Sequence, residues 1–276
     1  MIILLQCTDR VGLVADIAKI MANFSLNIIS MREFVSKTDN RFFIRLEVDG
    51  EVDKDVLTKN IVSQLPNDTE IVVNPSPSKK IIVLVTKEYH CLGDILLRNY
   101  FNTLNASVQS VIGNHENLRE LTEKFNIPFH YIPYHEKTKE AFEEELLSEI
   151  NKYNTNYLVL AKFMRILSPE FVAKFNNSII NIHHSFLPAF MGTSPYRQAY
   201  ERGVKLIGAT AHFVTNKLDD GPIISQQIIP VNHAHTVRDM IISGKEIEKS
   251  VLAKALQLVF DDRVLVHNNK TVVFEN

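Results

Sequence analysis

An apolar run in the second half of the chain is interrupted by two polar side chains. The run Ile-Ile-Asn-Ile-His-His-Ser covers residues 179–185 and places Asn181 and His183 two positions apart. Its composition predicts a buried strand, in which alternate side chains point to the same face of a sheet. Buried polar groups need hydrogen-bond partners, so this pair belongs either to a polar network in the core or to a reaction centre.

Two later residues, His212 and Asp219, add a second imidazole and a carboxylate. Attack on an amide-like carbonyl needs a donor for the developing oxyanion, an acceptor for the proton of the nucleophile, and an acid for the leaving nitrogen. Asn181 would be the donor, His183 the acid, and Asp219 the base that orients water. Residue types alone leave a satisfied core network as the alternative.

The bulk composition is that of a globular protein. The chain has 276 residues, 45% hydrophobic and 22% charged, and is long enough for two domains. Its formal net charge of -2 indicates no nucleic-acid or anionic-membrane partner. Cys7 and Cys91 lie far apart in contexts that predict buried free thiols and a reducing compartment. No apolar run fits a signal peptide or a membrane span, so we expect a cytoplasmic protein.

Residues 1–74 predict a small α/β domain. Alternating and helical spacings give the order βαββαβ, which is the ferredoxin-like arrangement. In the strand at residues 42–48, aliphatic and aromatic side chains at the even positions alternate with Phe43, Arg45 and Glu47 at the odd positions, so we expect it to bury one face only. The expected strands are residues 2–5, 27–35, 42–48 and 70–73, and the expected helices begin near residues 13 and 54.

The turn Asp9-Arg10-Val11-Gly12-Leu13-Val14, followed by Leu26-Asn27-Ile28, resembles the ACT family of regulatory domains. Members of that family commonly pair their sheets and bind small amino acids near this turn. The resemblance implies a homo-oligomer and an amino-acid effector, for which glycine and methionine are candidates. Gly12 alone is better explained by a left-handed or crowded turn than by a ligand. The residues that the resemblance assigns to the effector site are Asp9, Arg10, Gly12, Leu13 and Asn27.

Residues 75–79 carry two prolines and two serines, which predicts a linker before a second domain at residues 80–276. Strands and helices alternate in this second domain. The alternation predicts a doubly wound, mostly parallel, Rossmann-like sheet, whose ligands bind along the carboxyl ends of the strands. The expected strands are residues 81–86, 107–112, a short one near 129, 157–161, 179–185, 208–214 and 222–230, and a last helix covers residues 237–259.

Three motifs, at residues 181–188, 208–214 and 218–224, together resemble the folate-dependent formyltransferase family. In that family the residues matching Asn181, His183 and Asp219 form the catalytic triad, and no metal or other cofactor takes part. The stretch 161–167 resembles the loop that lines the pterin pocket. The resemblance therefore implies a folate substrate, bound by Met164, Arg165, Ile166, Leu167, His212, Thr215 and Leu218.

Two departures from the transferases bear on the formyl acceptor. The glycine-rich phosphate loop of the glycinamide-ribonucleotide enzymes is replaced by Lys-Glu-Tyr-His-Cys-Leu-Gly at residues 87–93. The basic tRNA-binding domain of the methionyl-tRNA enzymes has no counterpart before Asn276. Water is the acceptor left. An ACT-like domain before this fold, together with His183-His184, resembles the formyltetrahydrofolate hydrolase family. That resemblance implies hydrolysis of 10-formyltetrahydrofolate, which would supply formate to purine synthesis and balance the one-carbon pool. His184 and Ser185 would then shape the water site or make structural hydrogen bonds.

Two alternatives use the same residues differently. A zinc hydrolase would draw on His183, His184, His212, His233 and His235. It is disfavoured because no His-Glu-x-x-His or paired-cysteine motif is present, and because adjacent histidines in a strand point to opposite faces. The other alternative is a regulatory protein whose folate domain binds its ligand without turnover.

Overall fold

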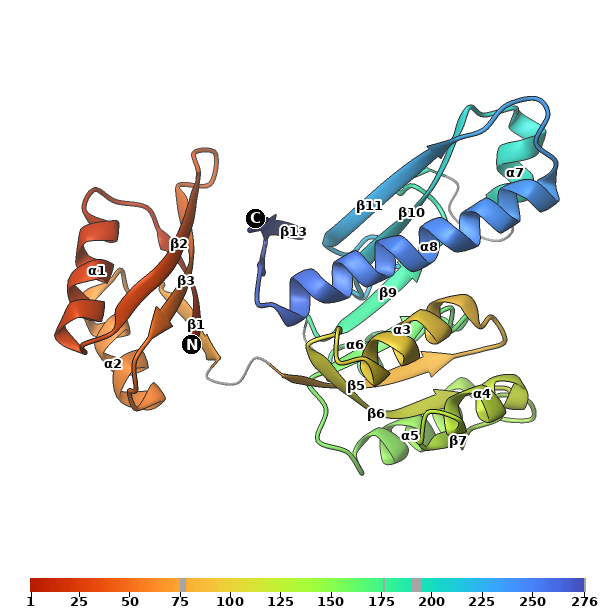
Figure 1. Ribbon diagram of the computed structural model, residues 1–276, viewed down its shortest axis with the longest axis horizontal. Coiled ribbons are helices and arrows are strands. Elements are labelled where there is room, and N and C mark those ends of the chain that lie inside the picture. The colour runs from red at the N-terminus through yellow and green to blue at the C-terminus, as the bar shows by residue number, and fades with distance from the viewer. Residues whose placement is uncertain (75–77, 176, 190–194, 276) are drawn as a thin grey trace. The chain divides into compact units, whose positions relative to one another are not determined.

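The computed structural model describes residues 1–74, 78–175, 177–189 and 195–275, which form two compact units (Figure 1). The first unit comprises Met1–Pro77 together with Asp261–Leu265 and Val272–Asn276. The second comprises Ser78–Phe260 and Val266–Thr271. Of the expected linker, residues 75–77 lie outside the described residues, and Lys79 already begins a strand.

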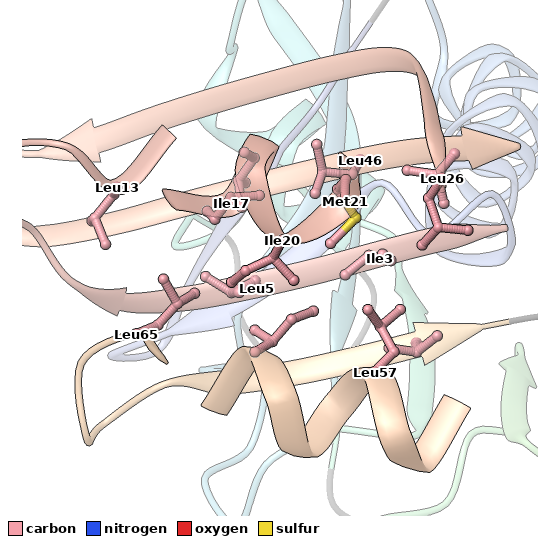
Figure 2. Packing of buried hydrophobic residues seen from close by; sticks show 14 of the residues in the cluster. Ile3, Leu5, Leu13, Ile17, Ile20, Met21, Leu26, Leu46, Leu57 and Leu65 are labelled. Carbon is pink, nitrogen blue, oxygen red and sulfur yellow. The ribbon is translucent and has the colours of Figure 1, made fainter. Parts of the chain in front are cut away.

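The first unit has the predicted ferredoxin-like order. Its elements are β1 (Ile2–Thr8), α1 (Leu13–Asn23), β2 (Asn27–Ser36), β3 (Arg41–Asp49), α2 (Lys54–Gln64) and β4 (Glu70–Asn74). The sheet order is β2-β3-β1-β4, and every neighbouring pair is antiparallel. Ile17 and Ile20 of α1 and Leu57 of α2 pack with Ile3 and Leu5 of β1 in one fully buried cluster (Figure 2).

The prediction that β3 buries only one face is wrong. Phe43 and Arg45, on the face expected to be open, are 1% and 7% exposed. Leu265 and Phe274 pack with Phe43 in a second apolar cluster, and the Arg45 guanidinium donates to two backbone carbonyls of the 261–265 segment at 2.9 and 3.2 Å. The covering residues are more than 200 positions away in the sequence, so no local pattern indicates them.

The covering residues belong to a C-terminal hairpin that the periodicity does not predict. Its strands, β12 (Val264–His267) and β13 (Lys270–Val273), form a two-stranded sheet. The base of the hairpin belongs to the first unit and its tip, Val266–Thr271, to the second. A division of the chain into the consecutive segments 1–74 and 80–276 therefore does not describe the C-terminus.

The second unit contains the predicted doubly wound, mostly parallel sheet. Strands β5 (Lys79–Val85), β6 (Ala106–Gly113), β7 (Phe129–Tyr131), β8 (Tyr157–Ala161) and β9 (Ile179–His183) run parallel. Strand β10 (Leu206–Phe213) is antiparallel to β9, and β11 (Ile223–Pro230) is antiparallel to β10. The order is β11-β10-β9-β8-β5-β6-β7. The strand order reverses between β5 and β8, which is the position where open α/β sheets bind ligands.

Helices cover this sheet. They are α3 (His90–Tyr100), the short pair η1 (Glu116–Leu118) and α4 (Arg119–Glu123), α5 (Lys139–Ile150), α6 (Pro169–Val172), α7 (Pro195–Arg202) and α8 (Val237–Phe260). The long helix α8 packs on β9, β10 and β11 and also against α3 and α7. Among the described residues, no helix has both the length and the apolar character that crossing a membrane requires.

Candidate active site

The pairing of β9 with β10 sets the first part of the site. In this antiparallel pair His212 lies directly opposite Asn181, and the Asn181 Nδ2 and His212 Nε2 atoms are 3.3 Å apart. The His212 Nδ1 atom lies 2.8 Å from the Phe213 carbonyl oxygen, which only accepts, so Nδ1 carries the proton. Nε2 of the neutral ring then accepts one N–H of Asn181. Among the described residues nothing accepts the second N–H of the Asn181 amide, which therefore remains available to a ligand.

Asp219 is brought to these residues by a tight loop after β10. Its Oδ1 atom lies 3.2 Å from His183 Nδ1 and 3.9 Å from His212 Nε2. The loop is held at its far end, where Phe213 N donates to the Pro222 carbonyl at 2.9 Å. A Cβ atom on Gly221 would lie 1.7 Å from the Phe213 carbonyl oxygen, so only glycine permits this close approach.

Burial and hydrogen bonding set the charges of the site. Burial raises the pKa of Asp219, but the hydrogen bond from His183 and the neighbouring imidazoles together lower it by more, so the pKa lies below its usual value. Burial also lowers the pKa of His212, against the opposing effects of the Phe213 carbonyl and Asp219. Asp219 is therefore an ionised acceptor beside a neutral His212.

These side chains open on a cavity of about 400 Å³. The loop after β8 forms another wall, where the apolar side chains of Met164 and Ile166 are 57% and 63% exposed. The guanidinium carbon of Arg165 lies 3.9 Å from the centre of the Tyr134 ring, which fixes its direction. All residues expected to contact the substrate line the cavity, as do the three expected catalytic residues: Met164, Arg165, Ile166, Leu167, His212, Thr215, Leu218, Asn181, His183 and Asp219.

His184 does not follow the alternating rule used against a zinc site. Its ring is stacked on that of His183, with centroids 5.1 Å apart and planes 21° apart. The strand β9 ends at His183, so the next residue is not bound by strand geometry. Burial and then the charge of Lys162 lower the pKa of His184 to about 4, which keeps it neutral at physiological pH. Ser185 is 3% exposed, and its carbonyl accepts a hydrogen bond from Thr210 Oγ1 at 2.9 Å.

A buried carboxylate beside the cavity is absent from the sequence prediction. Glu248 of α8 is 1% exposed and meets His90 Nε2 at 2.8 Å, Lys162 Nζ at 3.1 Å and the Tyr196 hydroxyl at 2.6 Å. Burial raises the pKa of Glu248, but the three partners lower it by more, so that the pKa is about 2. One signal was available: Glu248 falls on the apolar stripe of α8 that continues through Val251 and Leu252.

Glu248 also belongs to the one group of described side chains that could converge on a metal ion. Donor atoms of His90, Cys91 and Glu248 lie within 4.8 Å of one another. The Glu248 carboxylate already meets three donors there, and the Lys162 ammonium repels a cation. Burial raises the pKa of the Cys91 thiol, which disfavours the thiolate a metal needs. This donor set does not fit a metal, and the histidines of the zinc alternative form no such group in the described parts of the chain.

Four of the five expected effector residues lie in the turn before α1 or at the first residue of that helix, whereas Asn27 follows the far end of α1. Gly12, with φ 90°, precedes the helix, and no side chain caps the free backbone N–H groups there. Arg10 pairs with Asp16 at 2.6 Å, and Asp9 N donates to the Asn40 carbonyl. Leu13 is buried in the core and Asn27 is exposed at the start of β2. Within the described residues, no hydrogen bond or ion pair joins the five to one another.

Comparisons with known proteins agree with this architecture. Residues 79–256 match the formyl transferase family model, and residues 1–59 match the ACT domain model. The formyltetrahydrofolate deformylase of Haemophilus influenzae is 48% identical over 99% of this chain and 98% of its own length. The chain belongs to the formyltetrahydrofolate deformylase family. It is accordingly an enzyme of the hydrolase class, which replaces the alternative of a folate-binding regulator without turnover.

Solved structures place the deformylase family and the transferases on one fold. The formyltetrahydrofolate deformylase of Pseudomonas syringae pv. tomato has a TM-score of 0.94 and 37% identity, covering 99% of this chain and 94% of its own. A glycinamide ribonucleotide transformylase from Symbiobacterium toebii has a TM-score of 0.70 and 28% identity, covering 74% of this chain and 98% of its own. The formyl transferase family model covers residues 79–256, and the transformylase covers 74% of this chain, so the fold alone does not separate the two activities.

Proposed function

We propose that this chain hydrolyses 10-formyltetrahydrofolate to formate and tetrahydrofolate. The observation that carries the proposal is the convergence of Asn181, His183 and Asp219 on one cavity, which the loop of Met164 and Ile166 also lines. An exposed apolar wall facing polar catalytic groups suits a flat aromatic pterin bearing a polar formyl amide.

In the proposed reaction, Asp219 orients a water molecule and accepts its proton as the oxygen attacks the formyl carbon. The former carbonyl oxygen becomes an oxyanion, stabilised by the free N–H of Asn181 and by the Nε2–H of His183, whose ring carries a proton on both nitrogens in this step. When the carbon–nitrogen bond breaks, His183 gives its Nε2 proton to the leaving N10. Asp219 then releases the proton that it accepted from water to solvent, and His183 regains one proton from solvent. The formic acid formed loses its proton to solvent, so each turnover yields formate, tetrahydrofolate and one proton.

His212 acts through other residues in this proposal. Because Phe213 fixes the tautomer of its ring, His212 holds the amide of Asn181 with a lone pair and leaves the acidic chemistry to His183. The proposed reaction uses no metal and no other cofactor. That part of the proposal is supported by the donor set around Glu248, which is occupied by an ammonium group.

Water as the acceptor is supported by the loop between β5 and α3. Glu88 in this loop pairs with Lys245 of α8 at 2.6 Å, and His90 is bound to Glu248 at 2.8 Å. Side chains joined to α8 therefore stand where a phosphate-binding loop would need bare backbone. An amine substrate carrying a phosphate would have to break both interactions.

The proposal has five further parts. Glycine or methionine modulates the reaction through the ACT domain, which is supported by the uncapped helix start after Gly12. The protein forms a homo-oligomer and works in the cytoplasm. Its formate feeds purine synthesis, and its turnover balances the one-carbon pool. Deletion of the ACT domain, or millimolar glycine or methionine, should change the kinetics. Unchanged kinetics in both cases would remove the effector from the proposal.

The decisive experiment incubates the purified protein with 10-formyltetrahydrofolate and measures formate, with and without glycinamide ribonucleotide. We expect stoichiometric formate in both cases and no formylated nucleotide. A requirement for the nucleotide would make the chain a transferase. Asp219→Asn serves as the control, because it keeps the shape of the side chain but not the carboxylate.

A further inference from the structure

Lys162 adopts a backbone conformation that its side chain makes costly. Its φ is 63°, in the left-handed region, which costs a residue other than glycine on the order of 1 kcal/mol. Lys162 directly follows β8, is 9% exposed, and lines the same cavity as His183 and Asp219. A long cationic side chain held here against both strain and burial calls for a functional reason.

Glu248 holds the Lys162 ammonium in place. The two groups are 3.1 Å apart, and the carboxylate is itself fixed by the Tyr196 hydroxyl and by His90. The approach of Tyr196 depends on Gly244, one turn earlier in α8, where a Cβ atom would lie 2.2 Å from the Tyr196 ring. Three elements besides the Lys162 loop thus contribute to the position of one ammonium group.

The charge of Lys162 is only partly used within the protein. An ammonium group has three N–H donors, and Glu248 is its only ion-pair partner within the described residues. The carboxylate of Glu248 is shared with two further donors, so part of its charge is already engaged by His90 and Tyr196. Lys162 can therefore bind a second anion without losing the first.

The position of Lys162 indicates which anion this is. Its partner Glu248 is bound by Tyr196, whose ring centre lies 6.2 Å from that of His184. The His184 ring is stacked on that of His183, and His183 in turn meets Asp219. Lys162 thus lies at the reacting end of the cavity. The only carboxylate that arises at that end is formate, because the carboxylates of a folate are separated from N10 by a benzoyl ring. Formate would otherwise form beside the like charge of Asp219.

We propose that the Lys162 ammonium, held by Glu248, is the binding site for the carboxylate of the formate product. The proposal deepens the hydrolytic function and rests on it. It also distinguishes hydrolysis from transfer chemically, since transfer to an amine produces an amide and no anion. A cation at this place further disfavours a protonated amine as acceptor.

The test is a titration with ¹³C-formate followed by NMR, which requires no turnover. In Lys162→Met, which keeps the length of the side chain, formate should bind at least 10-fold more weakly than in the wild type. Lys162→Arg should retain the affinity within about threefold. Lys217→Met is the matched control: Lys217 lines the same cavity but its side chain is 82% exposed, and its loss should change the formate affinity less than twofold.

Three results would overturn the proposal. One is equal formate affinity in the wild type and Lys162→Met, and another is an equal loss in Lys217→Met. The third is a loss of tetrahydrofolate affinity in Lys162→Met with formate affinity kept, because Lys162 would then bind a folate carboxylate. If Lys162→Met does not fold, the wild type still tests the proposal. The ¹⁵Nζ resonance of Lys162 is the lysine resonance that is missing from the spectrum of Lys162→Arg, and formate must shift this resonance in the wild type. Formate binding at Lys162 in a protein that releases no formate would refute the hydrolytic function alone.

Discussion

Replacement of Gly221 by alanine tests whether the loop after β10 positions the catalytic carboxylate. The added Cβ would lie 1.7 Å from the Phe213 carbonyl oxygen, whereas carbon and oxygen atoms ordinarily approach to about 3.3 Å. The loop and the strand end must therefore separate by roughly 1.6 Å. That shift breaks the 2.9 Å hydrogen bond from Phe213 to Pro222 and carries Asp219 away from His183.

The expected result of Gly221→Ala is a large loss of turnover with a modest loss of stability. A misplacement of about 1 Å in an active site costs on the order of 10²-fold, so kcat for formate release should fall by about 10²-fold or more. Overpacking should lower the free energy of unfolding by roughly 1–3 kcal/mol in a urea titration.

The matched control for this prediction is Gly93→Ala in α3. A Cβ on Gly93 meets no atom within 4 Å, so kcat should stay at the wild-type value, and the helix should gain up to about 1 kcal/mol. Wild-type turnover and stability in Gly221→Ala would refute the reasoning, because the close approach at Phe213 would then have no role in placing Asp219.

Four further predictions concern the site, its buried carboxylate and the cover over β3. Asp219→Asn should lower kcat by about 10²- to 10⁴-fold while fluorescence titration gives a tetrahydrofolate affinity within about threefold of the wild type. Because the pKa of Asp219 lies below its usual value, protonation of this carboxylate should reduce kcat only below about pH 4. A fall of kcat near pH 6 in the wild type that is absent from Asp219→Asn would contradict this. The pKa of Glu248 is about 2 in the folded protein and about 4.3 when unfolded, so its stabilising effect is complete above pH 4.3 and is lost as the pH falls toward 2. Over that pH range the free energy of unfolding of Glu248→Gln should fall less steeply than that of the wild type. Parallel curves for the two proteins would refute this prediction. Phe274→Ala should lower the free energy of unfolding of the first unit by about 3 kcal/mol in a urea titration, because it removes the side chain that covers Phe43. A change below about 1 kcal/mol would show that this face of β3 needs no cover.

The sequence was sufficient for the order of most elements in both units because their signals are local. Alternation, helical spacing and turn residues predicted the order of strands and helices in both units, as the sheets confirm. The cover over β3 was beyond reach for the opposite reason. Arg45 and Phe43 look solvent-facing in their own strand, and only Leu265 and Phe274, far along the chain, make them core residues.

The buried charges beside the cavity were missed for a related reason. Glu248 lies in a helix whose apolar stripe explains its packing without a charged residue, and Lys162 lies in a loop that is predicted only from its likeness to a pterin-binding segment. A charged residue on the apolar face of a helix demands a partner, which is a physical signal available from sequence. The identity of the partner was not available, since Lys162, His90 and Tyr196 come from three other elements.

The antiparallel course of β10 explains why Asn181 and His212 meet, although they are 31 positions apart. Sequence alternation placed Asn181 with His183, and Thr210 with His212, but gave neither the direction nor the register of the pairing. Direct cross-strand pairs in an antiparallel ladder bring side chains of one face within reach, and His212 pairs with Asn181. The pairing of β10 with β11 shifts register between Ala211 and His212, as a β-bulge does where a side chain is re-aimed. His212 therefore accepts one N–H of Asn181 at Nε2, while its Nδ1–H donates to the Phe213 carbonyl of its own strand. The other amide N–H of Asn181 is left for the oxyanion.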